Sequence, residues 1–155
     1  MPPVSCAHLL ASTVRDFTLR IIATLSADTS IGCIVLLSGP TDYLSDGSTV
    51  IRLSNGNELL GQITGAGCVL GTTIATFCGA ASMVASGTSE GVLVQGDMLL
   101  ATAAGTLALT ISAQRAAGRG EVRGPGTFLP ALIDELGMLT SEIILRMAKI
   151  EVELE

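Results

Sequence analysis

The stretch from Gln62 to Phe77, QITGAGCVLGTTIATF, decides how the rest of the chain is interpreted. Two glycines flank Ala66, Cys68 follows at once, and an uncharged run of small and apolar residues continues to Ser89. Such a stretch can be an ordinary turn before a buried helix. It can also be an anion-binding cradle, because the first N–H groups of a helix lack internal partners and the helix dipole adds partial positive charge there.

In the second interpretation, Gly65, Ala66, Gly67 and Cys68 form an anion hole for a transferring phosphoryl group. The glycines let an anion approach the main chain with no Cβ in the way. The motif is not a Walker loop, because no Gly-Lys-Ser or Gly-Lys-Thr follows it. Taken alone, it is a weak signal for catalysis, and the neighbouring sequence has to decide.

The composition limits the class of protein. The chain has 155 residues, of which 48% are hydrophobic and 14% charged, so it is long and apolar enough for one domain with a sizeable core. Its formal charge of −6 offers the phosphate backbone of nucleic acid no attractive surface. We therefore expect no nucleic-acid partner.

The cysteines predict a reducing compartment. Cys6, Cys33, Cys68 and Cys78 form no CxxC pair, and the single histidine, His8, cannot complete a metal set. The first ten residues, MPPVSCAHLL, lack the basic region of a secretory signal. Free thiols are then the expected state, and we expect a cytoplasmic protein with no metal ligands assigned in this chain.

Two uncharged runs, 63–89 and 98–114, raise the alternative of membrane spans. Their content is mostly Gly, Ala, Ser and Thr, which favours insertion little, and no basic cluster flanks either run. A helix that is apolar on all sides is also what the interior of an α/β layer requires. We therefore predict buried helices and no membrane partner.

The first half of the chain predicts one helix and then strands. Helical spacing of apolar residues predicts an amphipathic helix over 8–28. The continuous apolar run within 32–39 is typical of a strand buried on both faces of a parallel sheet. Residues 41–47 are expected to form a turn, and 49–53 a strand. Asn55-Gly56 then predicts a tight turn, after which Leu59 and Leu60 return to the core.

The second half predicts helices. They are expected over 68–85 and 91–117, the latter with Asp97 near its start and Arg115 at its end, as the helix dipole favours. A loop of glycine and charge, GRGEVRGPG, separates them from a helix over 127–139 capped by Thr127. The tail, 140–155, is also expected to be helical.

Three ordered motifs resemble one family. They are SGPTDYLSDG (38–47), NGNELLGQITGAGC (55–68) and GPGTFLPALIDEL (124–136). In order and spacing they resemble the hydroxyethylthiazole kinase family, including the kinase half of fungal bifunctional thiamine-biosynthesis proteins. The resemblance covers the chain from about Ile34 to Leu139. It implies an α/β fold that is the C-terminal portion of a ribokinase-like fold, with few sheet strands followed by several packed helices.

The resemblance also implies an activity and a set of site residues. The family transfers the ATP γ-phosphate to the hydroxyl of 4-methyl-5-(2-hydroxyethyl)thiazole in thiamine biosynthesis. Cys68 holds the position of the catalytic general base, Gly65 lines the substrate hydroxyl, and Ser38 contacts ATP. Ala66 and Gly67 complete the anion hole; Ala66 replaces a more usual threonine but keeps its backbone N–H. The anion hole alone does not exclude another kinase of this fold that acts on a different alcohol.

The resemblance covers only the C-terminal part of the family's domain. Residues 1–155 are therefore expected to be a single partial domain, and the thiazole pocket, an arginine for ATP and the Mg²⁺ ligands are expected in an N-terminal half. An exposed edge strand and an uncovered apolar face should follow. Family members resemble trimers with active sites between subunits, so a homo-oligomer is expected if the full domain is present. The alternative is an inactive fragment or an interaction partner of intact kinase subunits.

Asp42 and Asp46 are expected to be turn residues.

Overall fold

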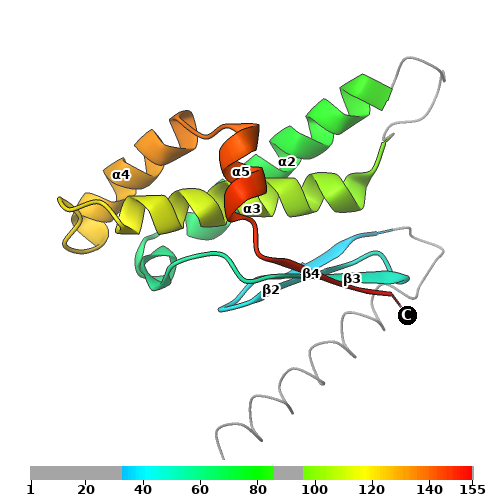
Figure 1. The fold of residues 1–155 in the computed structure, drawn as a ribbon, viewed down its shortest axis with the longest axis horizontal. Coiled ribbons are helices and arrows are strands. Elements are labelled where there is room, and N and C mark those ends of the chain that lie inside the picture. The colour runs from blue at the N-terminus through cyan, green and yellow to red at the C-terminus, as the bar shows by residue number, and fades with distance from the viewer. Residues whose placement is uncertain (1–32, 86–95, 155) are drawn as a thin grey trace, which may run out of the picture.

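The computed structural model describes residues 33–85 and 96–154, which form one sheet with helices packed on one of its faces (Figure 1). The helix predicted over 8–28 lies outside these residues. In chain order the elements are β1 (Val35–Leu37), β2 (Asp42–Ser45), β3 (Thr49–Leu53), the 3-10 helix η1 (Glu58–Gln62), α2 (Ala66–Ala85), α3 (Met98–Ala117), α4 (Pro125–Gly137), α5 (Ser141–Met147) and β4 (Ile150–Leu154). Few strands followed by packed helices is the α/β arrangement that the sequence predicts.

The sheet is antiparallel throughout the described residues, which corrects the expected parallel sheet. Its order is β1-β2-β3-β4, and each strand pairs antiparallel with the next. The apolar run that suggested burial on both faces ends in β1, an edge strand of this sheet, where Leu37 is 44% exposed. A continuous apolar run therefore does not distinguish a central parallel strand from a short edge strand covered by helices on one face.

The expected turn over 41–47 is also wrong, because most of it is β2. Leu44 pairs with Leu36 of β1 and with Ile51 of β3, and it is fully buried. Asp42 and Ser45 stand at the two ends of the strand, and each side chain accepts a hydrogen bond from a main-chain N–H of the adjoining connection. The turn-forming residues are thus the ends of a four-residue strand.

The C-terminal tail changes from helix to strand. Thr140 caps α5 through its side chain, as a helix start at that point predicts, but the helix ends at Met147. The strand β4 then pairs with β3, so that Ile150 lies opposite Leu53 and Val152 opposite Ile51. The prediction of a helix to residue 155 is therefore wrong from Ala148 onward. Strand pairing with β3 replaces the helical hydrogen bonds that the sequence pattern favoured.

The central helix is α3, which separates the sheet from α4. Arg115 lies in its last turn, as predicted, but the helix begins at Met98 and not at residue 91. Asp97, expected within the helix near its start, is instead its N-cap and accepts a hydrogen bond from the N–H of Leu100. The hydroxyls of Thr102, Thr106 and Thr110 donate to the carbonyl four residues earlier. Because each hydroxyl is satisfied within the helix, this row of threonines can be buried against other elements.

Two apolar clusters hold the layers together. Leu44, Ile51 and Leu53 of the sheet pack on Leu107 and Ile111 of α3. On the other side of α3, a second cluster contains Leu109, Ala113, Ala116, Phe128, Ala131 and Leu132, with Leu59 and Leu60 packed against it as expected. Two salt bridges to buried Glu135 of α4 hold the helices together, one from Arg115 of α3 and one from Arg119 just after that helix. The core thus lies on both sides of α3.

The helix α2 packs closely on α3 along one side. A Cβ added to Gly105 of α3 would stand 2.6 Å from the Cα of Ile74, so only glycine fits at this crossing. No residue of α2 is buried, however, which corrects the prediction of a buried helix. Met83 and Val84, near its C-terminal end, are 80% and 88% exposed. These exposed side chains agree with the expectation of an uncovered apolar face.

Among the described residues, α2 is the one helix whose length and apolar composition would suffice for a membrane span. Length and composition alone are weak evidence for membrane insertion, because the buried core helix of a soluble protein meets the same criteria; α2 itself has no buried residue. α4 begins at Pro125 with Gly124 as its N-cap, two residues before the predicted start. Thr127 is not the N-cap; its hydroxyl accepts from the N–H of Arg123 and donates to the carbonyl of Gly124.

Candidate functional site

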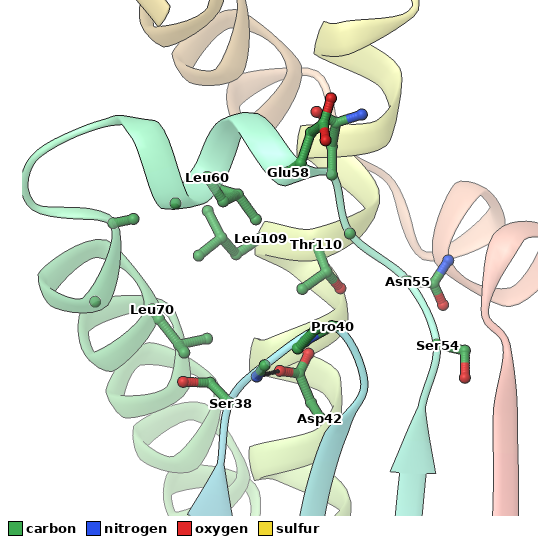
Figure 2. Close-up of a pocket in the computed structure, with 16 residues that line it drawn as sticks. Ser38, Pro40, Asp42, Ser54, Asn55, Glu58, Leu60, Leu70, Leu109 and Thr110 are labelled. Atoms are coloured by element: carbon green, nitrogen blue, oxygen red, sulfur yellow. Dashed lines mark hydrogen bonds between the residues drawn. The ribbon is translucent and has the colours of Figure 1, made fainter. Parts of the chain in front are cut away.

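A pocket of about 560 Å³ opens at the end of the sheet, between η1, the start of α2 and the middle of α3 (Figure 2). Ser38 and Asp42 lie at one end of the view and Glu58 at the other, with Leu70, Leu109 and Thr110 between them. Four parts of the chain contribute the lining: the β1–β2 connection, the segment after β3, the start of α2 and α3. The lining residues are Ser38, Gly39, Pro40, Asp42, Ser54, Asn55, Gly56, Asn57, Glu58, Leu60, Gly61, Ala66, Gly67, Leu70, Leu109 and Thr110.

The first wall is the β1–β2 connection, which runs from Ser38 to Asp42. Oδ1 of Asp42 accepts a hydrogen bond of 3.0 Å from the main-chain N–H of Gly39. Asp42 is only 4% exposed, and burial raises the pKa of its carboxyl, while the Gly39 hydrogen bond acts in the opposite direction. Asp42 is therefore the first residue of β2, not the turn residue that was expected, and its carboxyl is a buried acid at the pocket.

The second wall is the extended segment after β3. Asn55-Gly56 does not form the predicted tight turn. The side chain of Asn55 instead donates to Oε1 of Gln114 at 2.7 Å and to the carbonyl of Met147 at 3.0 Å. Its own oxygen accepts from the N–H of Lys149 at 2.8 Å. These three hydrogen bonds tie the pocket wall to α3 and to the segment that precedes β4.

The third wall is the glycine-rich turn at the start of α2. Gly65 has φ +89°, a backbone conformation that favours glycine, and the helix begins at the next residue. Its carbonyl accepts the first helical hydrogen bond, from the N–H of Val69. The N–H groups of the first turn then have no partner inside the helix. This is the backbone geometry that the cradle interpretation requires.

The structure brings three of the five predicted site residues to one pocket. Ser38, Ala66 and Gly67 line it from two different elements. Gly65 and Cys68 flank Ala66 and Gly67 on the same turn, yet they are not among the lining residues in the part of the chain that the structure describes. Cys68 is exposed. Its thiol is therefore accessible beside the pocket rather than enclosed within it.

Sequence reasoning missed several polar residues of the pocket. Asp42 was assigned to a turn, Asn55 to a turn and Thr110 to an apolar helix. Asp42 belongs to the motif SGPTDYLSDG, and its place in that motif was the sequence signal that could have marked it. Its burial at the end of a strand is known only from the structure. Asn55 is 4% exposed and makes its hydrogen bonds 59 to 94 residues away in sequence, which no local pattern reveals.

The charges at the pocket are acidic. Of the residues that line it, Asp42 and Glu58 carry carboxylates, and neither Lys nor Arg is among them. Within residues 33–85 and 96–154, no group of three or more His, Cys, Asp or Glu side chains is placed to hold a metal ion. The features that suit an anion are the first-turn N–H groups of α2 and the hydroxyl of Ser38.

The fold and this glycine-rich turn define the class as a ribokinase-like α/β protein. The solved structure of a hydroxyethylthiazole kinase from Pyrococcus horikoshii OT3 matches 95% of the chain with a TM-score of 0.71 and 24% sequence identity, and the match covers 50% of that structure. At this identity the likeness concerns the fold.

The sequence comparison names the family. The family model of the hydroxyethylthiazole kinase family matches residues 11–142, so the chain belongs to that family. The hydroxyethylthiazole kinase of Thermoanaerobacter pseudethanolicus is 35% identical over 77% of the chain. The probable thiamine biosynthetic bifunctional enzyme of Schizosaccharomyces pombe is 38% identical over 72% of it. The chain spans 40% of the first relative's length and 20% of the second's.

Proposed function

We propose that the chain is the C-terminal part of a hydroxyethylthiazole kinase, which transfers the γ-phosphate of ATP to the hydroxyl of 4-methyl-5-(2-hydroxyethyl)thiazole. The observation that carries the proposal is that Ser38, Ala66 and Gly67 line the same pocket at the N-terminus of α2, in a chain of this family. The glycine-containing first turn of a helix can bind a phosphate, because its free N–H groups and the helix dipole both favour negative charge.

Each predicted residue has a stated role in this proposal. Ser38 contacts ATP through its hydroxyl, while the N–H groups of Ala66 and Gly67 bind the transferring phosphoryl oxygens. Gly65 lies beside the substrate hydroxyl. Cys68 accepts the hydroxyl proton on its sulfur as the hydroxyl oxygen bonds to the γ-phosphorus and the bond from that phosphorus to the ADP oxygen breaks. The exposed thiol of Cys68 is within one helical residue of the pocket lining, which supports this assignment.

The partial-domain proposal explains what the pocket lacks. Mg²⁺, when bound, would neutralise charge on the phosphates, and Asp42 and Glu58 are the carboxylates at this pocket. Further ligands for the metal, a cation for ATP and the thiazole pocket would come from an N-terminal half, which would pack on the exposed face of α2. An oligomer with sites between subunits, and a cytoplasmic location, belong to the same proposal.

An ATP-dependent phosphorylation assay on the thiazole alcohol tests the proposal. It compares the purified chain with a longer form that includes a family N-terminal half. Phosphorylated thiazole alcohol formed by the longer form supports the kinase; no product from either form contradicts it. In the active form, Cys68→Ala should lower kcat roughly 10²- to 10⁴-fold, the range for a general base. Cys78→Ala, on the same helix but away from the pocket, is the matched control.

A second candidate is an inactive fragment that associates with intact kinase subunits. The uncovered apolar face of α2 favours it, because such faces bind protein surfaces. Turnover by the longer form with none by the purified chain would support this candidate for the chain alone. Co-elution of the chain with intact kinase subunits in size-exclusion chromatography would then be expected, and separate elution would contradict it.

A further inference from the structure

Asn55 is the buried residue of the pocket's second wall, which consists of residues 54–58. It is 4% exposed, and its side chain points away from Thr110 and from the middle of the pocket (Figure 2). Its amide nitrogen donates two hydrogen bonds and its amide oxygen accepts one, all to groups of α3 and of the segment before β4. The side chain therefore holds the wall in place and is not free to bind a ligand.

The wall is attached to the C-terminal segment at two neighbouring points. Besides the side chain of Asn55, the N–H of Ser54 donates to the carbonyl of Lys149 at 3.0 Å. Gly56 follows with φ +135°, a conformation that favours glycine, and a Cβ added to it would meet Thr110 of α3 at 4.0 Å. The chain turns here toward η1, so the groups that hold Ser54 and Asn55 fix the direction from which the wall enters this turn.

The wall lines the same pocket as the residues that the proposed function assigns to ATP, which are Ser38, Ala66 and Gly67. A wall that already has its ligand-bound position loses less conformational freedom when the ligand binds, and the ligand is bound more tightly. Residues 147–149 are described in full and are not among the lining residues, yet they supply two of the three partners of Asn55.

We propose that Asn55 is a positioning residue of this pocket, which holds residues 54–58 in place for ATP, so that Gln114 and residues 147–149 behind the wall help to set the affinity for ATP. This inference rests on the proposed function. Loss of Asn55 should weaken ATP binding and leave the transfer step unchanged, because no bond that forms or breaks involves the wall. Since coupling is reciprocal, ATP in the pocket should also stabilise the attachment of residues 147–149.

Steady-state kinetics of the longer form test this role with Asn55→Ala, Gln114→Met and the double variant. We expect Asn55→Ala to raise the KM for ATP at least about fivefold, the lower end of typical coupling between sites, with kcat within about twofold of the wild type. Gln114→Met removes one partner of Asn55 from outside the pocket lining, and it should raise this KM about twofold or more, as for one lost hydrogen bond. If Gln114 acts through Asn55, the double variant has the KM of Asn55→Ala alone. Gln114→Met by itself decides the matter where Asn55→Ala does not fold.

Glu135→Gln is the control for lost stability. Glu135 lies outside the pocket lining, where it joins α4 to Arg115, so its replacement should destabilise the protein without changing the KM for ATP. Amide exchange followed by NMR gives a second measurement. Slower exchange of the Lys149 N–H when ATP is added to the wild type supports the coupling, and unchanged exchange there contradicts it.

An unchanged KM for ATP in both Asn55→Ala and Gln114→Met overturns the inference and leaves the proposed function standing. An equal rise of KM in Asn55→Ala and Glu135→Gln also overturns it, because the effect would then come from lost stability. Independent effects of the two changes in the double variant do the same, since Gln114 would then not act through Asn55. Absence of thiazole phosphorylation by the wild-type longer form overturns the proposed function, and this inference with it.

Discussion

The main-chain N–H of Lys149 donates a hydrogen bond of 2.8 Å to Oδ1 of Asn55, a residue 94 positions earlier in the chain. The same side chain donates to the carbonyl of Met147, and the N–H of Ser54 donates to the carbonyl of Lys149 at 3.0 Å. These contacts fix the point at which the chain leaves α5 and joins the sheet as β4. They also place the C-terminal segment directly behind a wall of the pocket.

Replacing Asn55 with Ala should lower the free energy of unfolding by about 3 kcal/mol, because it leaves the N–H of Lys149, Oε1 of Gln114 and the carbonyl of Met147 without their partner. Urea unfolding measures the change. Asn57→Ala is the control: Asn57 caps η1 through one hydrogen bond to the N–H of Leu59, and its loss should cost about 1 kcal/mol. Equal effects of the two changes would contradict the cross-linking role of Asn55.

Gly105→Ala should destabilise the chain by about 1–3 kcal/mol, since the added Cβ would overlap the main chain of Ile74 and force α2 away from α3. Thermal unfolding monitored by circular dichroism reports the change. Gly71→Ala, in the middle of α2 with no atom within 4 Å of the added Cβ, should stabilise by up to about 1 kcal/mol because alanine favours the helix. If Gly105→Ala were as well tolerated, the close crossing of the two helices would be wrong.

The two aspartates of β2 and its following turn should affect stability with opposite dependence on pH. Because the pKa of Asp42 is raised in the folded state, the free energy of unfolding decreases as pH rises from its ordinary pKa through the raised one. Because the pKa of Asp46 is lowered, its contribution is present above its ordinary pKa and is lost as pH falls through the lowered value.

Urea unfolding of the wild type, Asp42→Asn and Asp46→Asn between pH 3 and pH 7 tests both signs. Relative to the wild type, Asp42→Asn should gain stability at neutral pH and lose that advantage in acid. Asp46→Asn should be less stable at neutral pH and approach the wild type in acid. Parallel curves for the two variants would contradict the difference in environment.

Glu135→Gln should lower the free energy of unfolding by about 2 kcal/mol, because it leaves the guanidinium group of Arg115 without its charged partner and leaves Arg119 with exposed carboxylates only. Both arginines are partly exposed, which limits the loss. Chemical unfolding at low and high salt measures it. Glu121→Gln, which removes an exposed partner of Arg119, should change stability by less than about 0.5 kcal/mol. A similar loss in both variants would contradict a stabilising role for the buried carboxylate of Glu135 between α3 and α4.

The sequence by itself determined the helices α2 and α3, the strand β3, the helix start at Thr140, and the family. These features depend on local spacing, on residues that bond the unpaired main-chain groups at a helix end, or on ordered motifs. All three can be identified from the sequence alone. The glycine turn before α2 belongs to the same group. Glycine at position 65 permits the positive φ that the turn adopts.

Only the tertiary structure decided the direction of the sheet, the strand at the C-terminus and the polar side of the pocket. Residues 150–154 become a strand because β3 offers an unpaired edge beside them, and a local pattern does not record what lies across a sheet. Asp42 and Asn55 were taken for turn residues because their side chains do bond to main-chain groups. Their burial, and the distant partners of Asn55, arise from packing of α3 and β4 against segments far away in sequence.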